Sequence, residues 1–397
     1  MQKMRVSISE ICKIVSGGDK PDIVSDLPNS EYKYPIFGNA LDNKGLYGYA
    51  NFSVINEPAV TISARGSNCG EAFYRNEPYV PIVRLLSLLP QKNVINPKYL
   101  YYLIKNRHFK STGSGQPQIT IPQIANCKVD IFEDLAKQEQ IADVLFSLDE
   151  KIEINNKINT ELENMAKTLY DYWFVQFDFP DENKRPYKSA NGMMVYNEVL
   201  KREIPEGWEA LSLEKRLNFD RGVEFGSSEY IENPESKFDY IKFYRVGDMD
   251  NSGNTYISKY LPNLKLLKPY DLVVSFDGSV GRIANALEGA YSSGIRKITD
   301  KKGILDNSVL FLIMGDKYIQ SIIQRYAVGS NILHASSSIS HLFIPYNESV
   351  FIDFQNIITP IYKKIIKNKL EVISLTSLRD FLLPLLMNGQ VTVSSEH

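Results

Sequence analysis

An internal repeat constrains this chain of 397 residues more than any other feature of its sequence. The run Thr112-Gly113-Ser114 recurs as Val328-Gly329-Ser330, a separation of 216 residues between the two serines (114 to 330). Residues 63–67 (Ser-Ala-Arg-Gly-Ser) are echoed by residues 275–279 (Ser-Phe-Asp-Gly-Ser), and each run follows β-branched residues that predict a strand entering a glycine turn. This period is too long for a solenoid repeat, so we predict a duplicated domain.

Each copy is predicted to begin with short strands and to end in a long helix. Short apolar runs between turn residues, such as residues 34–39 and 243–248, read as strands. Apolar residues then recur at coiled-coil spacing over residues 141–172 and 361–385, interrupted by Asn155 and Asn368, and Gly389 offers a stop. The first helix is mainly acidic and the second mainly basic, which favours pairing between them with the asparagines fixing the register. The alternative is that each apolar stripe covers only its own domain.

These patterns give an α+β chain of two similar mixed α/β domains. The predicted segments are a first domain (1–133), a long helix (134–178), a linker (179–203), a second domain (204–350), a second long helix (351–390) and a tail (391–397).

The composition excludes several classes of protein. No apolar run reaches about 18 residues and the start contains no signal segment, so we expect a cytoplasmic protein without a membrane span. The three cysteines are far apart and lack CxxC spacing, which argues against a disulfide framework and a zinc site. The net charge of −2 means that any DNA binding has to come from local patches or from partners.

The sequence lacks the motifs of several classes of enzyme. It contains no (Asn/Asp)-Pro-Pro-(Tyr/Phe) tetrapeptide of an adenine methyltransferase, no Gly-x-x-x-x-Gly-Lys-(Ser/Thr) loop and no His-Glu-x-x-His pair. The acidic run at 180–184 is interpreted as a solvated turn rather than a set of nuclease carboxylates. We therefore predict no catalytic residues and no metal site. An unusual nuclease or methyltransferase is an alternative that methyl transfer by the purified chain would support.

Several stretches outside the predicted strands resemble the specificity subunits of type I restriction-modification systems. The resemblance covers essentially the whole chain and is carried by 137–142 (Lys-Gln-Glu-Gln-Ile-Ala), 148–152 (Leu-Asp-Glu-Lys-Ile), 169–174 (Leu-Tyr-Asp-Tyr-Trp-Phe), 187–189 (Tyr-Lys-Ser), 194–197 (Met-Val-Tyr-Asn), 204–209 (Ile-Pro-Glu-Gly-Trp-Glu) and 382–389 (Leu-Leu-Pro-Leu-Leu-Met-Asn-Gly).

The resemblance implies a DNA-recognition subunit that is not itself an enzyme. Each target-recognition domain would read one half of a bipartite double-stranded DNA site. The two long helices would pair antiparallel in a pseudo-twofold molecule, set the unread gap and dock two methyltransferase subunits, which restriction and translocase subunits then join. We expect no cofactor on this chain, with S-adenosylmethionine, ATP and Mg²⁺ bound only by partner subunits. The rival hypothesis is a non-catalytic coiled-coil scaffold without sequence reading.

Candidate DNA-binding residues fall in the repeated segments, because reading base edges needs donors and acceptors presented on loops. The segments after the Gly-Ser pairs offer Ser114, Gln116, Gln118 and Thr120 in the first copy, and Ser330, Asn331, His334 and Ser336 in the second. The glycine turns offer Arg65 and Ser67, then Asp277, Ser279 and Arg282, and Lys110, Arg245 and Arg296 are candidates for phosphates. The alternative is that these are ordinary polar loops and solvated bases.

For partner docking we single out exposed parts of the long helices and an aromatic cluster formed by Tyr170, Tyr172 and Trp173. Aromatic side chains at a helix end are equally typical of a hydrophobic core.

Overall fold

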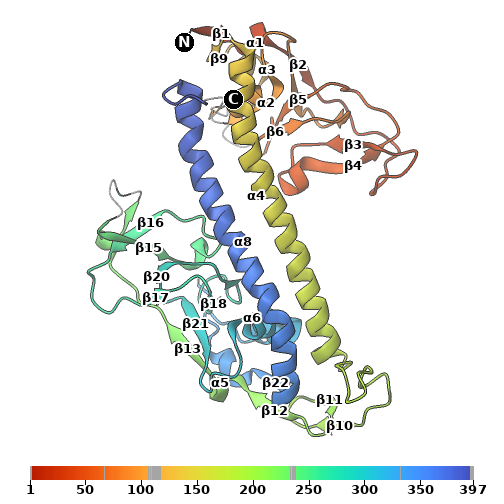
Figure 1. Ribbon diagram of the computed structural model, residues 1–397, viewed down its shortest axis with the longest axis vertical. Helices are drawn as coiled ribbons and strands as arrows, with labels where there is room; N and C mark the ends of the chain where they lie inside the picture. Colours follow the sequence, from red (N-terminus) through yellow and green to blue (C-terminus); the bar gives the residue numbers. More distant parts are fainter. Residues whose placement is uncertain are drawn as a thin grey trace. The chain divides into compact units, whose positions relative to one another are not determined.

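The computed structural model describes residues 2–66, 68–105, 107, 109, 118–232, 234, 238–330 and 332–393. These residues group into two compact units (Figure 1). Unit 1 contains Met1–Lys151 and Leu375–His397, and unit 2 contains Ile152–Ser374.

Unit 1 is built from short strands that precede a long helix. Its four-stranded antiparallel sheet has the order β2-β8-β5-β6, its three-stranded sheet has the order β4-β3-β7 with β3 and β7 parallel, and β1 pairs with β9. Helix α2 packs on β5, β6 and β8. The elements are β1 (Lys3–Ser7), α1 (Ile8–Ile11), β2 (Cys12–Ser16), β3 (Tyr34–Phe37), η1 (Asp42–Gly45), β4 (Leu46–Ala50), β5 (Ala59–Ile62), β6 (Ala72–Arg75), β7 (Val80–Pro81), β8 (Leu86–Pro90), α2 (Pro97–Lys105), α3 (Ile121–Ala125), β9 (Lys128–Phe132) and α4 (Leu135–Tyr170) up to Lys151.

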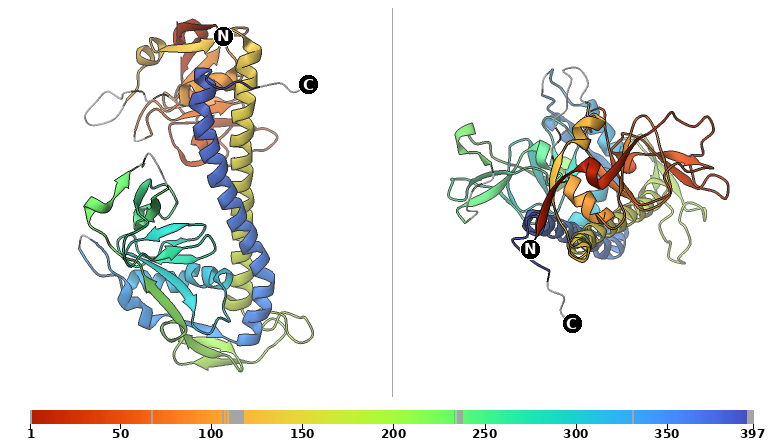
Figure 2. Two further views of the ribbon diagram at one scale, coloured as in Figure 1. Left: turned by 60° about the vertical axis from the view of Figure 1, so that its left-hand side comes forward. Right: turned by 90° about the horizontal axis from the view of Figure 1, so that it is seen from above.

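Unit 2 begins inside α4 and ends inside α8. Helix α6 packs on β18 and β21 of its four-stranded sheet (Figure 2). After α4 come η2 (Asp171–Val175), β10 (Met194–Asn197), β11 (Arg202–Pro205), β12 (Glu209–Ser212), α5 (Leu213–Arg216), β13 (Leu217–Arg221), η3 (Ser227–Glu229), β14 (Ile231–Glu232), β15 (Tyr240–Tyr244), η4 (Val246–Asp248), β16 (Thr255–Ser258), β17 (Leu266–Leu267), β18 (Leu272–Ser275), β19 (Ile283–Ala284), β20 (Gly289–Tyr291), β21 (Ile295–Asp300), α6 (Asn307–Gly315), α7 (Lys317–Arg325), η5 (Ser336–His341), β22 (Phe343–Tyr346) and α8 (Glu348–Asn388).

The two units repeat one topology, which confirms the predicted duplication and the α+β fold class. The sheet β13-β21-β18-β19 of unit 2 repeats β2-β8-β5-β6 of unit 1, and the pair β12-β22 repeats β1-β9. The parallel pair β15-β20 repeats β3-β7. Unit 2 adds β14 and β17 at the edges of its smaller sheet, and in it helix α7 follows α6. The segment between α4 and the second copy contains the hairpin β10-β11.

Each unit has its own core, to which both long helices contribute. In unit 1 the buried side chains of β5 and β8 pack with α2, the start of α4 and the end of α8, including Val60, Leu88, Leu100, Ile141 and Leu386. In unit 2 the core joins β18, β21 and α6 to the end of α4 and the start of α8. Burying one such aliphatic side chain contributes about 1.5–3 kcal/mol, so the helices are integral to both cores.

The helices α4 and α8 contact each other within each unit and run antiparallel. In unit 1, Arg379 Nη1 lies 2.6 Å from Asp149 Oδ1. In unit 2, the Asn155 amide donates to Glu371 (3.2 Å) and the Asn368 amide donates to Asn159 (3.0 Å). Residue numbers in contact therefore decrease along α8 as they increase along α4, which is the antiparallel pairing that the sequence predicts.

The end of α8 follows the predicted stop signal. The helix finishes at Asn388, and Gly389 adopts a φ of +77°, a conformation that glycine adopts without strain. None of the helices in the described part of the chain combines the length and the apolar character that a membrane span requires.

Candidate functional site

In unit 1 two segments that are distant in sequence form one edge. The glycine turn that follows β5 lies beside the segment that precedes α3. Arg65 and Gln118 form an antiparallel bridge, and the Ile119 N–H donates to the Ala64 carbonyl at 2.9 Å. Gly66 has a φ of +83°, which a glycine permits at this turn.

Unit 2 forms the same edge from the corresponding residues. Asp277 and His334 make the bridge, and the Ala335 N–H donates to the Phe276 carbonyl at 2.8 Å. The Gly278 N–H adds a bond to the Leu333 carbonyl, also at 2.8 Å. We call these two surfaces, where the sequence analysis expects DNA contacts, the reading edges of unit 1 (Arg65 and Gln118) and of unit 2 (Asp277 and His334). The two segments were predicted separately from the sequence, and the fold brings them together in both copies.

A tight loop precedes the reading edge of unit 2. Val328 and His334 exchange backbone hydrogen bonds of 3.0 and 2.8 Å, which closes the loop between them. Gly329 has a φ of +132°, and a Cβ at this position would lie 2.0 Å from the Ile332 carbonyl oxygen. Only glycine fits here, so backbone geometry explains the glycine of the second Gly-Ser pair. The first pair, at 113–114, lies outside the described residues. The candidate Ser330 is exposed in this loop.

The side chains at the reading edge of unit 2 are ionic and partly exposed. His334 Nδ1 lies 2.7 Å from Asp277 Oδ1, with the histidine side chain 60% exposed and the aspartate side chain 16% exposed. The Arg221 guanidinium lies 4.0 Å from the other carboxylate oxygen, Oδ2. The pair is held by two segments and remains accessible from outside.

Of the remaining unit 2 candidates, Arg296 is buried. Its side chain is 6% exposed, and burial lowers its pKa although Asp277 opposes that shift. Arg296 donates to the hydroxyl of Ser336 (3.1 Å) and to the Ser293 carbonyl. Burial removes the guanidinium from the reach of a DNA phosphate, so we do not carry the predicted phosphate role of Arg296 forward. Its contacts instead hold Ser336, itself exposed, near the edge.

Ser279 and Arg282 follow the same glycine turn in the chain. Arg282 donates to the carbonyl of Val246, the residue after Arg245, at 2.8 Å. Arg245 donates to Asp248 at 3.2 Å and to Thr255 at 2.9 Å, while part of its side chain stays exposed. The Ser279 carbonyl accepts from Ser275, and the Ser279 residue is exposed. Both arginines are therefore already engaged in contacts within the protein.

In unit 1 the candidate Thr120 caps a helix. It precedes α3 and forms a capping box with Gln123, whose side chain accepts from the Thr120 N–H at 2.8 Å. Gln118 lies on the reading edge of unit 1. The candidates that lie outside the described residues are Ser67, Lys110, Ser114, Gln116 and Asn331.

The aromatic docking candidates belong largely to the core of unit 2. Tyr170 and Trp173 are buried, and their ring centroids lie 6.1 and 5.2 Å from that of Phe354 on α8. These two side chains therefore belong to the hydrophobic core, and the prediction that they dock a partner is wrong. Tyr172 is exposed.

The predicted apolar stripe of the first long helix is only partly buried. It includes Ile158 and Met165, but the structure leaves these two side chains exposed together with Ile154, next to the buried line of α4 that includes Asn155 and Asn159. Residues 158, 165 and 172 are spaced by seven, so they form a second heptad line beside the buried one.

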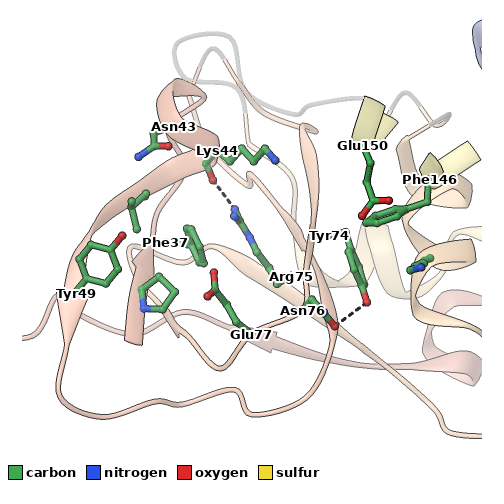
Figure 3. Close-up of a pocket in the computed structure, with 13 residues that line it drawn as sticks. Phe37, Asn43, Lys44, Tyr49, Tyr74, Arg75, Asn76, Glu77, Phe146 and Glu150 are labelled. Atoms are coloured by element: carbon green, nitrogen blue, oxygen red, sulfur yellow. Dashed lines mark hydrogen bonds between the residues drawn. The ribbon is translucent and has the colours of Figure 1, made fainter. Parts of the chain in front are cut away.

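A cavity of about 620 Å³ lies in unit 1 between the smaller sheet and α4 (Figure 3). Arg75 forms part of its wall, with its guanidinium carbon 3.6 Å from the centroid of Phe37. Burial lowers the pKa of Arg75 to about 10, and its donors bind Thr61 (3.0 Å) and the Lys44 carbonyl (2.6 Å). Arg75 is therefore held by contacts within the protein and helps to form the wall of the cavity. No cluster of three metal-ligating side chains occurs among the residues that the structure describes.

Comparison with known proteins gives consistent matches. Residues 2–164 match the family model described as the type I restriction modification DNA specificity domain. The type I restriction enzyme MjaIX specificity subunit of Methanocaldococcus jannaschii is 25% identical over 95% of this chain and 88% of its own length. The HindI specificity subunit of Haemophilus influenzae is 24% identical over 92% of this chain and 93% of its own length.

A solved structure shares the fold. The crystal structure of the type I restriction-modification S subunit from M. genitalium aligns with a TM-score of 0.60 over 97% of this chain and 96% of that one. The sequence identity is 18%, so this likeness establishes the fold.

Proposed function

Because this chain belongs to the type I restriction-modification specificity subunits, we propose that its two units read the two halves of a bipartite DNA target. The supporting observation is the repeated reading edge. The same backbone bridge holds Arg65 and Gln118 in unit 1, and Asp277 and His334 in unit 2. Identical backbone support with different side chains is what two readers of different half-sites require, because base edges are distinguished by donors and acceptors.

In this proposal α4 and α8 set the unread gap between the half-sites. Helix α4 is continuous over 36 residues and α8 over 41. At 1.5 Å per residue, these lengths correspond to about 54 and 62 Å. One turn of B-DNA rises about 34 Å, so helices of this size are long enough to space two readers by a turn or more.

Methyltransferase subunits are the proposed partners, and the exposed line of Ile154, Ile158 and Met165 on α4 is their proposed docking surface. Apolar side chains at heptad spacing on an exposed helix face suit a partner helix. Partner subunits would also supply phosphate contacts that a chain of net charge −2 lacks. Restriction subunits would join this core.

Docking is tested by placing a charge on the line. The full chain carrying Ile158→Glu with Met165→Glu should no longer co-purify with its methyltransferase, because a buried unpaired carboxylate is costly at an interface. Thr160→Glu, also exposed on α4, is the matched control and should leave the complex intact. Retention of the partner by the double variant would refute this surface.

Catalysis is assigned to the partners, with S-adenosylmethionine, ATP and Mg²⁺ bound there. The purified chain alone should transfer no methyl group from S-adenosylmethionine to DNA. A measured transfer that survives further purification would overturn the non-catalytic assignment.

The experiment that tests the proposed function combines the full chain with the methyltransferase encoded beside it. Modified adenines are then mapped across a genome. We expect a two-part motif with a fixed unread gap. A continuous motif, or no motif with an active methyltransferase, would contradict the proposal and favour a scaffold without sequence reading.

A further inference from the structure

The two bridge positions of the reading edge have the properties of a specificity determinant. In both units one bridge residue precedes a glycine with a positive φ. The other bridge residue precedes a buried residue, Ile119 or Ala335, whose N–H donates to a backbone carbonyl of the glycine turn. The backbone is therefore held in the same way in the two copies. The side chains differ completely, since an arginine and a glutamine in unit 1 are replaced by an acid and a histidine in unit 2. In unit 2 the two bridge side chains, Asp277 and His334, also bind each other.

Asp277 determines which nitrogen of His334 carries the proton. An ionised carboxylate has only acceptor oxygens, so the 2.7 Å contact requires that His334 Nδ1 donates to Asp277 Oδ1. A neutral imidazole that donates from Nδ1 has an acceptor at Nε2. The ring is 60% exposed, so Nε2 is the nitrogen left for an outside donor.

The backbone that carries the ring is held by hydrogen bonds to two other segments, and the ring itself contacts Asp277. The His334 backbone bonds to Val328 across the loop that Gly329 closes, and Gly278 and Leu333 link the loop to the glycine turn. An acceptor held in one position discriminates between bases, because only a base that places a donor at that position can bind to it. In the major groove the exocyclic amines of adenine (N6) and cytosine (N4) are donors, whereas guanine O6 and thymine O4 are acceptors.

We infer that the His334 imidazole, oriented by Asp277, recognises the exocyclic amino group of one adenine or cytosine in the half-site read by unit 2. The inference rests on the proposed function, and it identifies the chemical group that unit 2 reads. Asp277 acts as a positioning residue in it, since its carboxylate is directed to the ring.

The test uses the complete complex of the full chain with its methyltransferase. Competition binding is measured at pH 8 with duplexes in which one amino group of the half-site is removed at a time, by purine in place of adenine or 2-pyrimidinone in place of cytosine. For the unsubstituted chain, one of these removals should weaken binding roughly tenfold, the order of a single base contact. His334→Ala should bind that duplex and its parent equally, while retaining the losses at the other positions.

Two further variants separate orientation from contact. In Asp277→Asn an amide that both donates and accepts replaces the acceptor-only carboxylate, so the ring is free to turn either nitrogen outward. This variant should still bind and should lose most of the preference for adenine or cytosine over guanine or thymine at that position. Arg65→Ala, at the matching bridge position of unit 1, should leave the amine dependence of the unit 2 half-site unchanged.

The outcomes distinguish the inference from the proposed function. If the complex methylates a two-part motif and His334→Ala keeps every amine dependence, the inference is overturned while the proposed function stands. The same holds if Asp277→Asn discriminates as the unsubstituted chain does. If the complex reads no two-part motif, the proposed function fails first. Tryptophan fluorescence checks folding, because Trp173 and Trp208 both lie in the core of unit 2.

Discussion

The Asp300 carboxylate of unit 2 is fully buried and has several strong partners. Arg216 donates to its two oxygens at 2.6 and 3.1 Å, and the Ile304 and Leu305 N–H groups donate at 2.8 and 2.9 Å. Burial by itself raises the pKa of Asp300, but the Arg216 guanidinium and the backbone donors outweigh it, so the pKa lies below its ordinary value. The Arg216 side chain is buried too, so each partner depends on the other.

Asp300→Asn should therefore destabilise unit 2 by about 3–5 kcal/mol, because it leaves the Arg216 charge buried and unpaired. Tryptophan fluorescence during urea unfolding reports this loss. Since the pKa of Asp300 is lowered by folding, its contribution is present above the unfolded value of about 3.9 and disappears as the pH falls through the folded value. The free energy of unfolding of Asp300→Asn should therefore fall less with decreasing pH than that of the unsubstituted chain. Asp239→Asn, at an exposed pair with Lys259, should change stability by less than about 1 kcal/mol.

Gly329→Ala should damage the reading edge of unit 2 without unfolding its core. Its positive φ and the 2.0 Å approach of the new Cβ to the Ile332 carbonyl force the loop to move, and His334 moves with it. We expect methylation mapping to show a relaxed unit 2 half-site with the unit 1 half-site retained. Gly303→Ala is the control, because that glycine also has a positive φ but has open space around its Cβ position. Equal effects of the two variants would argue against this role of the loop.

At the scale of elements, the contact between α4 and α8 in unit 2 contains a buried polar network. The Asn368 amide donates to Asn159, whose own amide donates to the Ile365 carbonyl at 3.3 Å. Both asparagines are buried. Such groups reduce stability relative to apolar packing and select one register, because a shifted helix would leave them without partners.

Asn368→Ala should cost about 1–3 kcal/mol, because it leaves the Asn159 oxygen buried without its donor. The double variant Asn159→Leu with Asn368→Leu should be closer to the unsubstituted chain or more stable, since both polar partners are removed together. Urea unfolding followed by tryptophan fluorescence measures both. Asn164→Ala, at an exposed position of α4, should have an effect below about 0.5 kcal/mol. A double variant less stable than Asn368→Ala would contradict the argument.

At the scale of the whole molecule, the repeated topology predicts that the two readers are exchangeable. Replacing residues 1–133 by the corresponding segment of a relative should alter one half of the methylated motif and preserve the other half and the gap. The reason is that the four-stranded sheets of the two units have the same order and that the pair β12-β22 repeats β1-β9, so each unit forms its own edge. Methylation mapping of the exchanged chain provides the measurement. A change in both halves would mean that the units do not read independently.

The sequence by itself determined the duplication, the two long helices and the segments that carry the candidate site. Backbone requirements are local: Gly66, Gly278 and Gly329 are needed for positive φ, and the heptad lines and Gly389 follow from helical periodicity. Such signals can be read without knowing what lies next to them. The resemblance to type I specificity subunits came mainly from the helical segments and from the junction that follows α4.

Only the tertiary structure decided which of these residues meet. Asp277 and His334 are 57 residues apart, and their bond exists because the sheet brings the glycine turn beside the later loop. The burial of Arg296, Tyr170 and Trp173 was likewise invisible in the sequence, because an arginine or an aromatic residue has the same local pattern inside and outside a core. Exposure and long-range pairing depend on neighbours that the fold supplies, whereas turns and helices depend mainly on the residues themselves.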